Sequence, residues 1–454
     1  MDTYEVFIKL SESSSRYRAA MMCRMNRRAM ARGRRLWQLL WKASGGIMQE
    51  CTPYPRMTRR TMTHADNSLP ELHPAGGPWS IYLHVPFCAS RCGYCDFNTY
   101  VLSAMGDDAV AGHLDAAHRE LELAANALGD AQPPVSTIFF GGGTPTMLSP
   151  VQLGELIDHI RTLWGIDSDA EVTTEANPET LSAEVLADLL KAGINRLSMG
   201  MQSADEYVLT VLDRRHRPGR AVEMAQLARQ VGFDDVSLDL IFGTPGENLD
   251  SWRHSLDAAL TAKPDHISAY SLIVEKGTRL AGRIRRGELP MTDEDDLADK
   301  YLLTEKILTE AGYVNYEVSN WARPRSGRDH RCRHNMAYWL GYDWWGIGPG
   351  AHSHVAGTRW WNVKHPATYR NVLGDRMLPV DDYEVLDDVQ RHEETVLLRL
   401  RLADGLPMAD LSEVECMRAT EVVKQGLGTM EEGRLVLNLS GRMVADRIIT
   451  DLLV

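Results

Sequence analysis

The chain has 454 residues, 44% of them apolar, so two or three domains with substantial hydrophobic cores are expected. The formal net charge of -13 argues against a nucleic-acid-binding protein, because such proteins neutralise phosphates with basic side chains. The sequence contains no run of 18 apolar residues, which argues against a membrane-spanning helix, and its seven cysteines do not suggest a secreted disulfide framework.

Residues 1–75 are expected to form a basic extension ahead of the folded part of the chain. Between Arg16 and Lys42 the sequence has nine basic residues and no acidic one. Such a segment is typical of a transit-peptide-like presequence, or of a basic arm that touches a membrane or a polyanion. We favour a third interpretation, a disordered extension that results from an upstream translation start, with Met62 as the true first residue.

Short β-like runs alternate with helical stretches from Trp79 onward. The β-like runs span residues 79–85, 135–140, 170–176, 196–201, 235–242 and 266–273. The helical patterns between them include residues 116–128, 150–164, 182–193 and 219–233. Strands that alternate with helices predict βαβ units and a parallel sheet. Six units indicate an incomplete (β/α) barrel, and a doubly wound sheet with the same periodicity is the alternative.

Chemically unusual residues follow the ends of several β-like runs. Cys88 follows the first run, and Gly141–Pro145 follow the second. Glu175 and Asn177 lie at the third, and Gly243–Gly246 follow the fifth. Because active sites of parallel barrels form at the carboxyl ends of the strands, these residues together predict a functional site at that end.

Three cysteines, Cys88, Cys92 and Cys95, form a C-x3-C-x2-C pattern in one short loop. Structural zinc usually takes four ligands, so Cys332 or a histidine would have to complete a zinc site. Iron–sulfur clusters are commonly held by four cysteine thiolates, so three cysteines leave one iron of a 4Fe-4S cluster without a protein ligand. An open metal position is a place where a substrate or cofactor binds. A structural metal knuckle is the less favoured alternative.

The second half of the chain has a different composition. Residues 313–324 and 344–354 are rich in aromatic residues, glycine and histidine, whereas residues 388–402 have a helical pattern and the end reads as strand, turn and helix. We therefore expect four parts: the extension 1–75, a barrel at 76–285, a flanking region at 286–384 and a small winged-helix-like C-terminal domain at 385–454. The acidity of the last part argues against DNA binding.

The cysteine spacing, with Tyr94 before the last cysteine, resembles that of the radical S-adenosylmethionine (radical SAM) superfamily. The segments "YLHVPFC" (82–88) and "GGGTPT" (141–146) are similar to those of oxygen-independent coproporphyrinogen III oxidases and of the related HemW-type heme chaperones. The resemblance covers about residues 79–450. It implies an α/β fold, a partial (β/α)6 TIM-like radical SAM barrel with a small α+β C-terminal accessory domain. It also implies a 4Fe-4S cluster on the three cysteines, with SAM on the open iron.

The resemblance further implies a SAM pocket built from strand ends. Gly142, Gly143 and Thr144 would hold the methionyl amino group, because glycines let the backbone approach a ligand closely. Tyr82 would lie near the methionyl carboxylate. A tight βα turn and a core tyrosine are the structural alternatives for these positions.

Five more positions complete the pocket that the resemblance implies. Glu175 would accept hydrogen bonds from the ribose or amino group, and Asp239 would contact the ribose. Gln202 matches the family pattern by its spacing, and Arg214 offers a forked donor to the methionyl carboxylate. The backbone near Ile273 would contact the adenine.

The sequence departs from the family patterns at two positions. Asp213 precedes Arg214 where the family usually has glycine, which is expected to change the loop and to neutralise part of the arginine charge. Phe97 stands where the decarboxylating oxidase carries another cysteine, two residues after the third. The long N-terminal substrate-binding segment of the oxidase has no recognisable counterpart. Both the Phe97 difference and the missing segment argue against oxidation of coproporphyrinogen.

The segment "RHNMAYW" (333–339) matches the H-N-x-x-Y-W element of the heme-chaperone branch. His334 would supply an imidazole to heme iron, and Tyr338 and Trp339 would stack on the macrocycle. A single histidine among aromatic residues is more often structural. Competing ligands are Cys332, His352 and His354.

The favoured hypothesis is a heme chaperone that binds a 4Fe-4S cluster, SAM and heme and passes heme to apo-proteins. The cluster and SAM would serve dimerisation or gating more than repeated turnover, and an electron donor is a further expected partner. The alternatives are an oxygen-independent coproporphyrinogen III oxidase, a radical SAM enzyme with another substrate, and a structural iron–sulfur protein. A cytoplasmic location is expected, and peripheral membrane contact and a homodimer are left open.

Overall fold

The protein is described by a computed structural model that covers residues 69–74, 76–129, 132–325 and 327–454. The expected basic extension therefore lies almost wholly outside the described residues. Within the described ranges, no helix is both long enough and apolar enough to cross a membrane.

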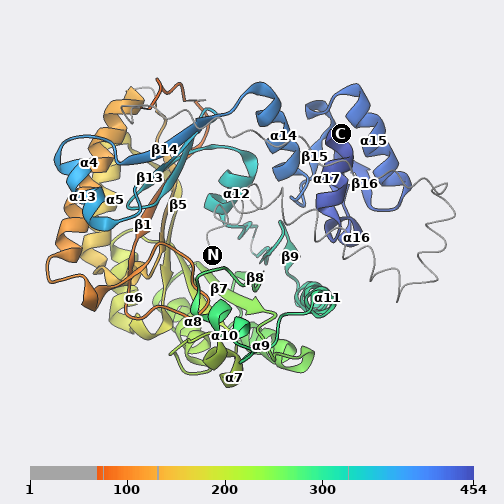
Figure 1. The fold of residues 1–454 in the computed structure, drawn as a ribbon, viewed down its shortest axis with the longest axis horizontal. Coiled ribbons are helices and arrows are strands. Elements are labelled where there is room, and N and C mark those ends of the chain that lie inside the picture. Colours follow the sequence, from red (N-terminus) through yellow and green to blue (C-terminus); the bar gives the residue numbers. More distant parts are fainter. Residues whose placement is uncertain (1–68, 75, 130–131, 326) are drawn as a thin grey trace. The chain divides into compact units, whose positions relative to one another are not determined.

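A sheet of 12 strands organises most of the described chain (Figure 1). Its central strands are parallel and lie in the order β11, β1, β4, β5, β6, β7, β8. Their bounds are β1 (Trp79–Val85), β4 (Val135–Gly142), β5 (Ile166–Ala176), β6 (Arg196–Gln202), β7 (Asp235–Phe242), β8 (His266–Ser271) and β11 (Asp343–Ile347). All six predicted β-like runs are confirmed as parallel strands, and β11 is a parallel strand that the βα rhythm did not predict.

Antiparallel strands extend both edges of the parallel sheet. Beyond β11 lie β12 (His352–Val355), β13 (Thr358–Asn362) and β14 (Val380–Val385), and beyond β8 lie β10 (Asn320–Ala322) and β9 (Val314–Asn315). The strand order ends at β14 and β9, which are not paired with each other. The barrel is therefore open. Its strands β1, β4, β5, β6, β7 and β8 lie side by side in chain order, without the reversal of a doubly wound sheet, which confirms the expected partial barrel. The sheet continues across residue 285, and the expected boundaries at 285 and 385 stay predictions.

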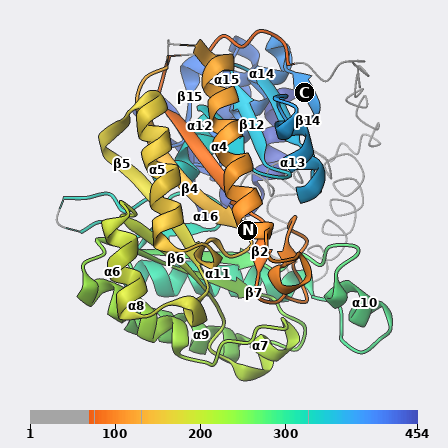
Figure 2. The same cartoon turned by 90° about the vertical axis from the view of Figure 1, so that its left-hand side faces the viewer.

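Helices cover the outer face of the parallel strands, and Figure 2 shows α4 and α5 side by side there. These helices are α4 (Ala109–Leu128), α5 (Pro150–Trp164), α6 (Ala183–Lys191), α8 (Arg220–Val231) and α9 (Leu249–Thr261). The remaining helices of this part of the chain are α7 (Glu206–Val211), α10 (Arg279–Arg285), α11 (Glu294–Glu310), α12 (Arg333–Leu340) and α13 (Pro366–Gly374). The helix α12 lies on the opposite side of the sheet from α4 and α5 (Figure 1) and contacts β1 and β4.

The helix α5 shows how the local sequence sets these elements. Ser149 accepts a hydrogen bond from the backbone N–H of Gln152, and the side chain of Gln152 accepts one from Ser149 in return, a capping box. Pro150 occupies the first turn, where its missing N–H costs nothing. The buried residues Leu153, Leu156, Ile157 and Ile160 recur at helical spacing and pack into the main core.

The C-terminal part is a small α+β domain with a core of its own, as expected. Its three-stranded sheet has the order β15 (Leu406–Pro407), β17 (Arg434–Leu437), β16 (Gly428–Glu431). Its helices are α14 (Asp388–Arg399), α15 (Glu413–Lys424), α16 (Leu439–Arg442) and α17 (Ala445–Leu453). A separate hydrophobic cluster includes Val396, Leu406, Leu435 and Ile448. The winged-helix-like character of this domain stays a prediction.

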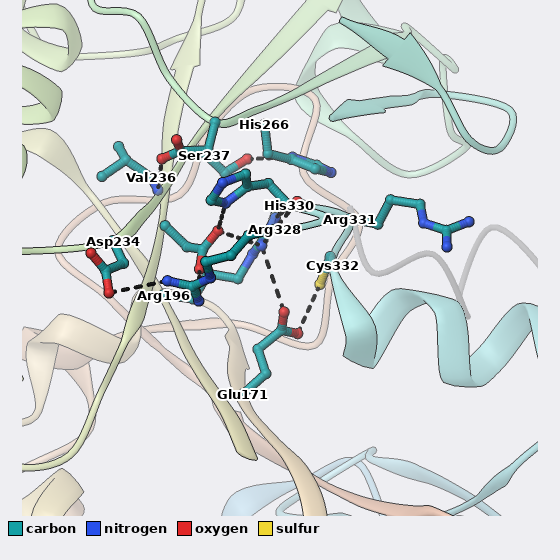
Figure 3. A network of polar contacts seen from close by, with 12 residues as sticks. Glu171, Arg196, Asp234, Val236, Ser237, His266, Arg328, His330, Arg331 and Cys332 are labelled. Atoms are coloured by element: carbon teal, nitrogen blue, oxygen red, sulfur yellow. Dashed lines mark hydrogen bonds and ion pairs between the residues drawn. The ribbon is translucent and has the colours of Figure 1, made fainter. Parts of the chain in front are cut away.

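A buried charge network lies at the N-terminal ends of β5, β6 and β7 (Figure 3). Arg196, the first residue of β6, is 2% exposed. One nitrogen of its guanidinium group, Nη1, lies 3.6 Å from Oε2 of Glu171 and 3.5 Å from Oδ1 of Asp235. Both terminal nitrogens also donate to the carbonyl oxygen of His330 at 3.2 Å. One arginine therefore joins three strands to the segment that leads into α12.

Glu171 connects this network to the start of α12. Its carboxylate accepts hydrogen bonds from the backbone N–H groups of Arg333 at 3.1 Å and His334 at 3.0 Å. The thiol of Cys332 donates to the same carboxylate at 3.4 Å. The N–H groups of Arg333 and His334 belong to the first turn of α12, where a helix leaves its N–H groups without partners and a negative charge is favourable. The network thus fixes α12 inside the N-terminal end of the barrel.

We expect Arg196→Met to destabilise the protein by about 3–5 kcal/mol, because it leaves the buried carboxylate of Glu171 without its cation and removes one of the two arginines that pair with Asp235. The matched control is Arg161→Met, which removes the exposed pair with Asp158 on α5 and should cost less than about 1 kcal/mol. Urea denaturation of both variants measures the difference. Equal stability of the two variants would contradict the structural role assigned to Arg196.

Candidate functional site

The three cysteines follow β1: Cys88 ends β2 (Phe87–Cys88), and Cys92 and Cys95 lie in the loop between β2 and β3 (Tyr100–Val101). Cys88 is buried, whereas Cys92 and Cys95 are partly exposed, and none is in a disulfide. Gly93 fixes the middle of the loop, because its N–H donates to the carbonyl of Leu212 at 3.1 Å and its carbonyl accepts from Leu280 N–H at 2.9 Å. The cysteine loop, residues 88–101, is therefore held between the end of α7 and the start of α10.

The donor set suits a cluster better than a single metal ion. Among the described residues, the three cysteines are not a group whose ligand atoms all lie within 4.8 Å of one another. Thiolates on one zinc ion lie closer than that, since each Zn–S bond is about 2.3 Å. Burial, with a smaller contribution from Cys95 and Cys92, raises the pKa of the Cys88 thiol to about 11. A thiolate at this position therefore needs cationic metal for its stabilisation, which a 4Fe-4S cluster supplies.

The glycine segment after β4 packs directly against the cysteine loop. A Cβ atom on Gly143 would lie 2.5 Å from the carbonyl oxygen of Phe87 and 3.0 Å from Sγ of Cys88, so no side chain fits there. The N–H of Thr144 donates to the same carbonyl at 2.8 Å. The hydroxyl of Thr144 lies 3.9 Å from Sγ of Cys88. The structure thus brings Gly143 and Thr144 next to Cys88.

Gly142 connects the glycine segment to the next strand. It has a φ of +108°, and its N–H donates to Oε2 of Glu175 on β5 at 3.1 Å. A Cβ atom at Gly142 would lie 2.5 Å from the ring of His84. On the same face of β1, the hydroxyl of Tyr82 forms a hydrogen bond with Nδ1 of His84 at 3.1 Å. The predicted residues Tyr82, Gly142 and Glu175 therefore lie on three neighbouring strands of the sheet.

Arg214 points at the cysteine loop from the segment after α7. Its Nη1 donates to Sγ of Cys92 at 3.4 Å, and its Nη2 donates to the carbonyl of Gly200 at 3.0 Å. Burial disfavours the charged guanidinium, yet Tyr94 and the Cys92 thiol raise the pKa of Arg214 above its ordinary value. A cation at this place favours the thiolate form of the ligand. Gln202, at φ 62°, lies beside Gly200 and Arg214, since a Cβ atom on Gly200 would meet both side chains.

The structure explains the departure at Asp213. This residue has a φ of 55°, a left-handed conformation that glycine adopts freely and aspartate tolerates better than most residues. Its carboxylate forms an ion pair with Arg279 on α10 at 3.6 Å. A Cβ atom on Gly93 would lie 2.4 Å from that carboxylate, so glycine at position 93 makes room for the aspartate.

Asp239 and Ile273 come from the far strands of the barrel. The carboxylate of Asp239 on β7 accepts hydrogen bonds from the hydroxyls of Ser198 at 2.9 Å and Ser268 at 2.7 Å. Burial raises the pKa of Asp239. Ile273 follows β8 and is 47% exposed. A half-buried carboxylate with two hydroxyl neighbours can accept a further hydroxyl donor, as a ribose contact requires. The SAM-binding roles of these residues stay predictions.

His334 lies inside the barrel, where its ring centroid is 6.5 Å from that of Tyr82, and it is away from the cysteine loop. It is 1% exposed and packs on the first half of β4, where Nδ1 lies 2.7 Å from the hydroxyl of Thr137. Its Nε2 lies 2.9 Å from the hydroxyl of Tyr338. The ring stacks on Phe139 at a centroid distance of 5.1 Å, and burial lowers the pKa of His334 to about 3. Both ring nitrogens are thus engaged inside the protein, at the end of β4 opposite the glycine segment.

Two residues near the site, His84 and Asn98, were missed in the sequence. Nε2 of His84 lies 3.0 Å from the carbonyl oxygen of Asn98. The side chain of Asn98 donates to the carbonyls of Pro349 and Lys364, both at 2.8 Å. The alternation within "YLHVPFC" places His84 on the same face as Tyr82 and could have pointed to it. No local signal marks Asn98, because its partners lie more than 250 residues further along the chain.

A second group of ligand-type atoms is formed by Asp235, Asp265 and His330, within 4.8 Å of one another. Protein cations already pair with these carboxylates. Asp235 pairs with Arg196 at 3.5 Å and with Arg328 at 3.1 Å. Asp265 pairs with Arg229 and with Arg325. The group therefore belongs to the ion-pair network of Figure 3, and we assign no metal to it.

Comparisons with known proteins agree with this geometry. Residues 82–259 match the family described as the Radical SAM superfamily. The chain is 50% identical over 386 residues to the heme chaperone HemW of Mycobacterium tuberculosis, across 85% of this chain and 97% of that protein. It is 36% identical to the heme chaperone HemW of Bacillus subtilis, across 74% of this chain and 86% of the relative.

A solved structure supports the fold. Coproporphyrinogen III oxidase (HemN) from Escherichia coli superimposes with a TM-score of 0.71 at 23% identity, across 83% of this chain and 90% of that chain. An open parallel barrel that presents three cysteines beside a glycine segment defines a radical SAM protein, for which a 4Fe-4S cluster and SAM are the implied cofactors. Within this superfamily the chain belongs to the HemW family.

We expect Cys88→Ser, Cys92→Ser and Cys95→Ser each to abolish assembly of a full cluster, because a serine oxygen replaces a required thiolate. Iron and sulfide analysis after anaerobic reconstitution, together with the visible absorption spectrum, measures the loss. The control is Cys416→Ser, which replaces a partly exposed cysteine on α15. This variant should assemble a full cluster. A full cluster in any of the three loop variants would mean that the ligand set is wrong.

The burial of His334 predicts a pH dependence of stability. Between pH 6.5 and about 3 the unfolded chain binds a proton at this residue that the folded chain does not. The free energy of unfolding should therefore fall by about 1.4 kcal/mol per pH unit below 6.5 from this group alone. In His334→Gln that contribution disappears, so the loss between pH 7.5 and 5.5 should be smaller than in the unmodified protein. Urea titrations of heme-free protein test this, with the exposed His365→Gln as control, and equal losses in all three proteins would contradict it.

Proposed function

We propose that the protein is a heme chaperone, which binds heme and delivers it to apo-proteins and carries a 4Fe-4S cluster and SAM at the C-terminal end of its barrel. The observation that carries this proposal is the 50% identity to a HemW heme chaperone across 97% of that relative's length. The geometry of the cysteine loop supports the cluster, since it presents three thiols and no fourth cysteine at position 97.

The residues of the site have separate tasks in this proposal. Cys88, Cys92 and Cys95 would hold three irons of the cluster, and the fourth iron would stay open to the amino and carboxylate groups of SAM. When reduced, a cluster of this kind supplies the electron that cleaves the sulfonium of SAM. Arg214, at 3.4 Å from Sγ of Cys92, contributes a positive charge that stabilises the anionic thiolate cluster. The role of these residues in turnover or in gating is part of the proposal.

The glycine segment and two half-buried acids, Glu175 and Asp239, would shape the SAM pocket. Gly143 lets the backbone pass next to Cys88, where any side chain would collide with the loop. Glu175 holds the N–H of Gly142 and thereby orients the segment that would face the methionyl amino group. Asp239, between two serine hydroxyls, would accept a ribose hydroxyl. Each of these contacts positions a ligand without itself taking part in bond cleavage.

The second candidate function is oxygen-independent oxidation of coproporphyrinogen III. The observation in its favour is the fold of HemN, with a TM-score of 0.71. Because that identity is 23%, the likeness concerns the fold. Phe97 at the position of the oxidase's further cysteine argues against this function. An electron donor, heme-accepting apo-proteins, a homodimer, peripheral membrane contact and a cytoplasmic location complete the proposal.

The reconstituted holoprotein should bind heme with a shift of the Soret band and should transfer it to an apo-acceptor, for which apomyoglobin is a convenient probe. With SAM and a reductant it should not convert coproporphyrinogen III over multiple turnovers. Absorption titration measures binding and transfer, and chromatography measures conversion. Repeated conversion of coproporphyrinogen, or a holoprotein that takes up no heme, would overturn the proposed function.

A further inference from the structure

The helices α4 and α5, which lie side by side in Figure 2, bring two histidines together. His118 lies on α4 and His159 on α5, and both side chains are partly exposed. The Nδ1 atoms of the two rings are 2.7 Å apart, and the ring centroids are 4.9 Å apart. Two imidazoles at this distance share one hydrogen bond, in which the N–H of one ring donates to the nitrogen of the other. No part of the proposed function uses this pair.

The separation of the two rings also suits a single metal ion. A bond between zinc and a histidine nitrogen is about 2.0–2.1 Å long, so two such nitrogens on one tetrahedral ion are about 3.3 Å apart. A small outward rotation of the two rings would bring the Nδ1 atoms from 2.7 Å to that separation. Burial, followed by His159, lowers the pKa of His118. The imidazole of His118 is therefore neutral at pH 7, the form that binds metal.

Carboxylates flank the histidine pair on both helices. Asp115 lies three positions before His118 on α4 and Glu122 four positions after it, and Glu155 lies four positions before the histidine of α5. Side chains at these spacings are neighbours on one face of a helix. All three acids are exposed, and their charges oppose the lowering of the His118 pKa, which places them near its ring. Asp115 is paired with Arg119 at 2.7 Å, so the two glutamates are the better candidates for a third ligand.

The histidine pair joins the two helices that come after the predicted cofactor segments. In chain order α4 follows the cysteine loop, and α5 follows the glycine segment at the end of β4. An ion held by both rings would therefore link these two βα units on the outer face of the sheet. The site is separate from the cysteines, because its ligands come from the covering helices and not from the loops at the strand ends.

We propose that His118 and His159 bind one divalent transition-metal ion, such as Zn²⁺ or Ni²⁺, between α4 and α5, with a carboxylate of Glu122 or Glu155 and water as the further ligands. Imidazole is a ligand that suits these ions. Among the described residues, no carboxylate oxygen forms a group of three ligand atoms within 4.8 Å with the two rings, so an exposed glutamate side chain rotates toward the ion. This inference does not depend on the proposed heme-chaperone function.

The test is anaerobic equilibrium dialysis of the cluster-loaded holoprotein against Ni²⁺ at pH 7.5, with bound nickel measured by elemental analysis. The unmodified protein should bind one equivalent that His118→Gln and His159→Gln each bind at least about tenfold more weakly, since loss even of outer-shell partners costs 10–100-fold. His254→Gln, which removes an exposed imidazole from α9, is the matched control and should bind as much nickel as the unmodified protein. Iron and sulfide content verifies that the cluster of each variant is loaded.

The outcomes distinguish a metal site from a simple contact between helices. Equal nickel binding by the unmodified protein, His118→Gln and His159→Gln would overturn the proposal, because the pair would then be a hydrogen bond between α4 and α5 and no more. An excess of Mg²⁺ should leave the bound nickel in place, because Mg²⁺ prefers oxygen ligands. Displacement of the nickel by Mg²⁺ would also overturn the proposal, since carboxylates alone would then form the site.

Discussion

The buried guanidinium of Arg196 between Glu171 and Asp235 is the interaction on which the interior of the barrel depends. It joins three parallel strands at their N-terminal ends, and through Glu171 it satisfies the first N–H groups of α12. Charges this deeply buried are tolerated because each carboxylate has several donors. With α12 fixed inside one end of the open barrel, the other end is left for cofactor chemistry, which is the division of labour typical of parallel barrels.

Much of the fold could be predicted from local periodicity. The strands β1, β4, β5, β6, β7 and β8 lie where alternating β-like and helical runs placed them, because each βα unit buries its own apolar face. The strand β11 could not be predicted in the same way. Its sequence DWWGI is followed by a turn and an antiparallel strand, not by a helix, and its parallel partner β1 begins 264 residues earlier. Only tertiary pairing defines such a strand.

The site was predictable to the extent that its chemistry is local. Cys88, Cys92 and Cys95 share one loop. The glycines at the end of β4 indicate a close approach of two backbone segments, and the structure shows this approach between Gly143 and the cysteine loop. The depth of His334 was not predictable, because a motif match gives the residue type but not its hydrogen-bond partners. Those partners, Thr137 and Tyr338, come from a strand almost 200 residues away and from the helix itself.

The contacts of Asn98 join parts of the chain that are far apart in the sequence. The side-chain amide of Asn98 donates to the carbonyls of Pro349 and Lys364, and the backbone carbonyl of Asn98 lies within hydrogen-bond distance of His84. The ring of His84 in turn lies against Gly142 of the glycine segment. A displacement of the cysteine loop or of the glycine segment must therefore alter the contacts that hold the segments around Pro349 and Lys364, and the reverse holds as well. The packing leaves little room for independent movement, since a Cβ atom on Gly350 or Gly142 would already collide with Asn98 or His84. The cysteine loop, the glycine segment and residues 349–364 are therefore joined through a short chain of direct contacts.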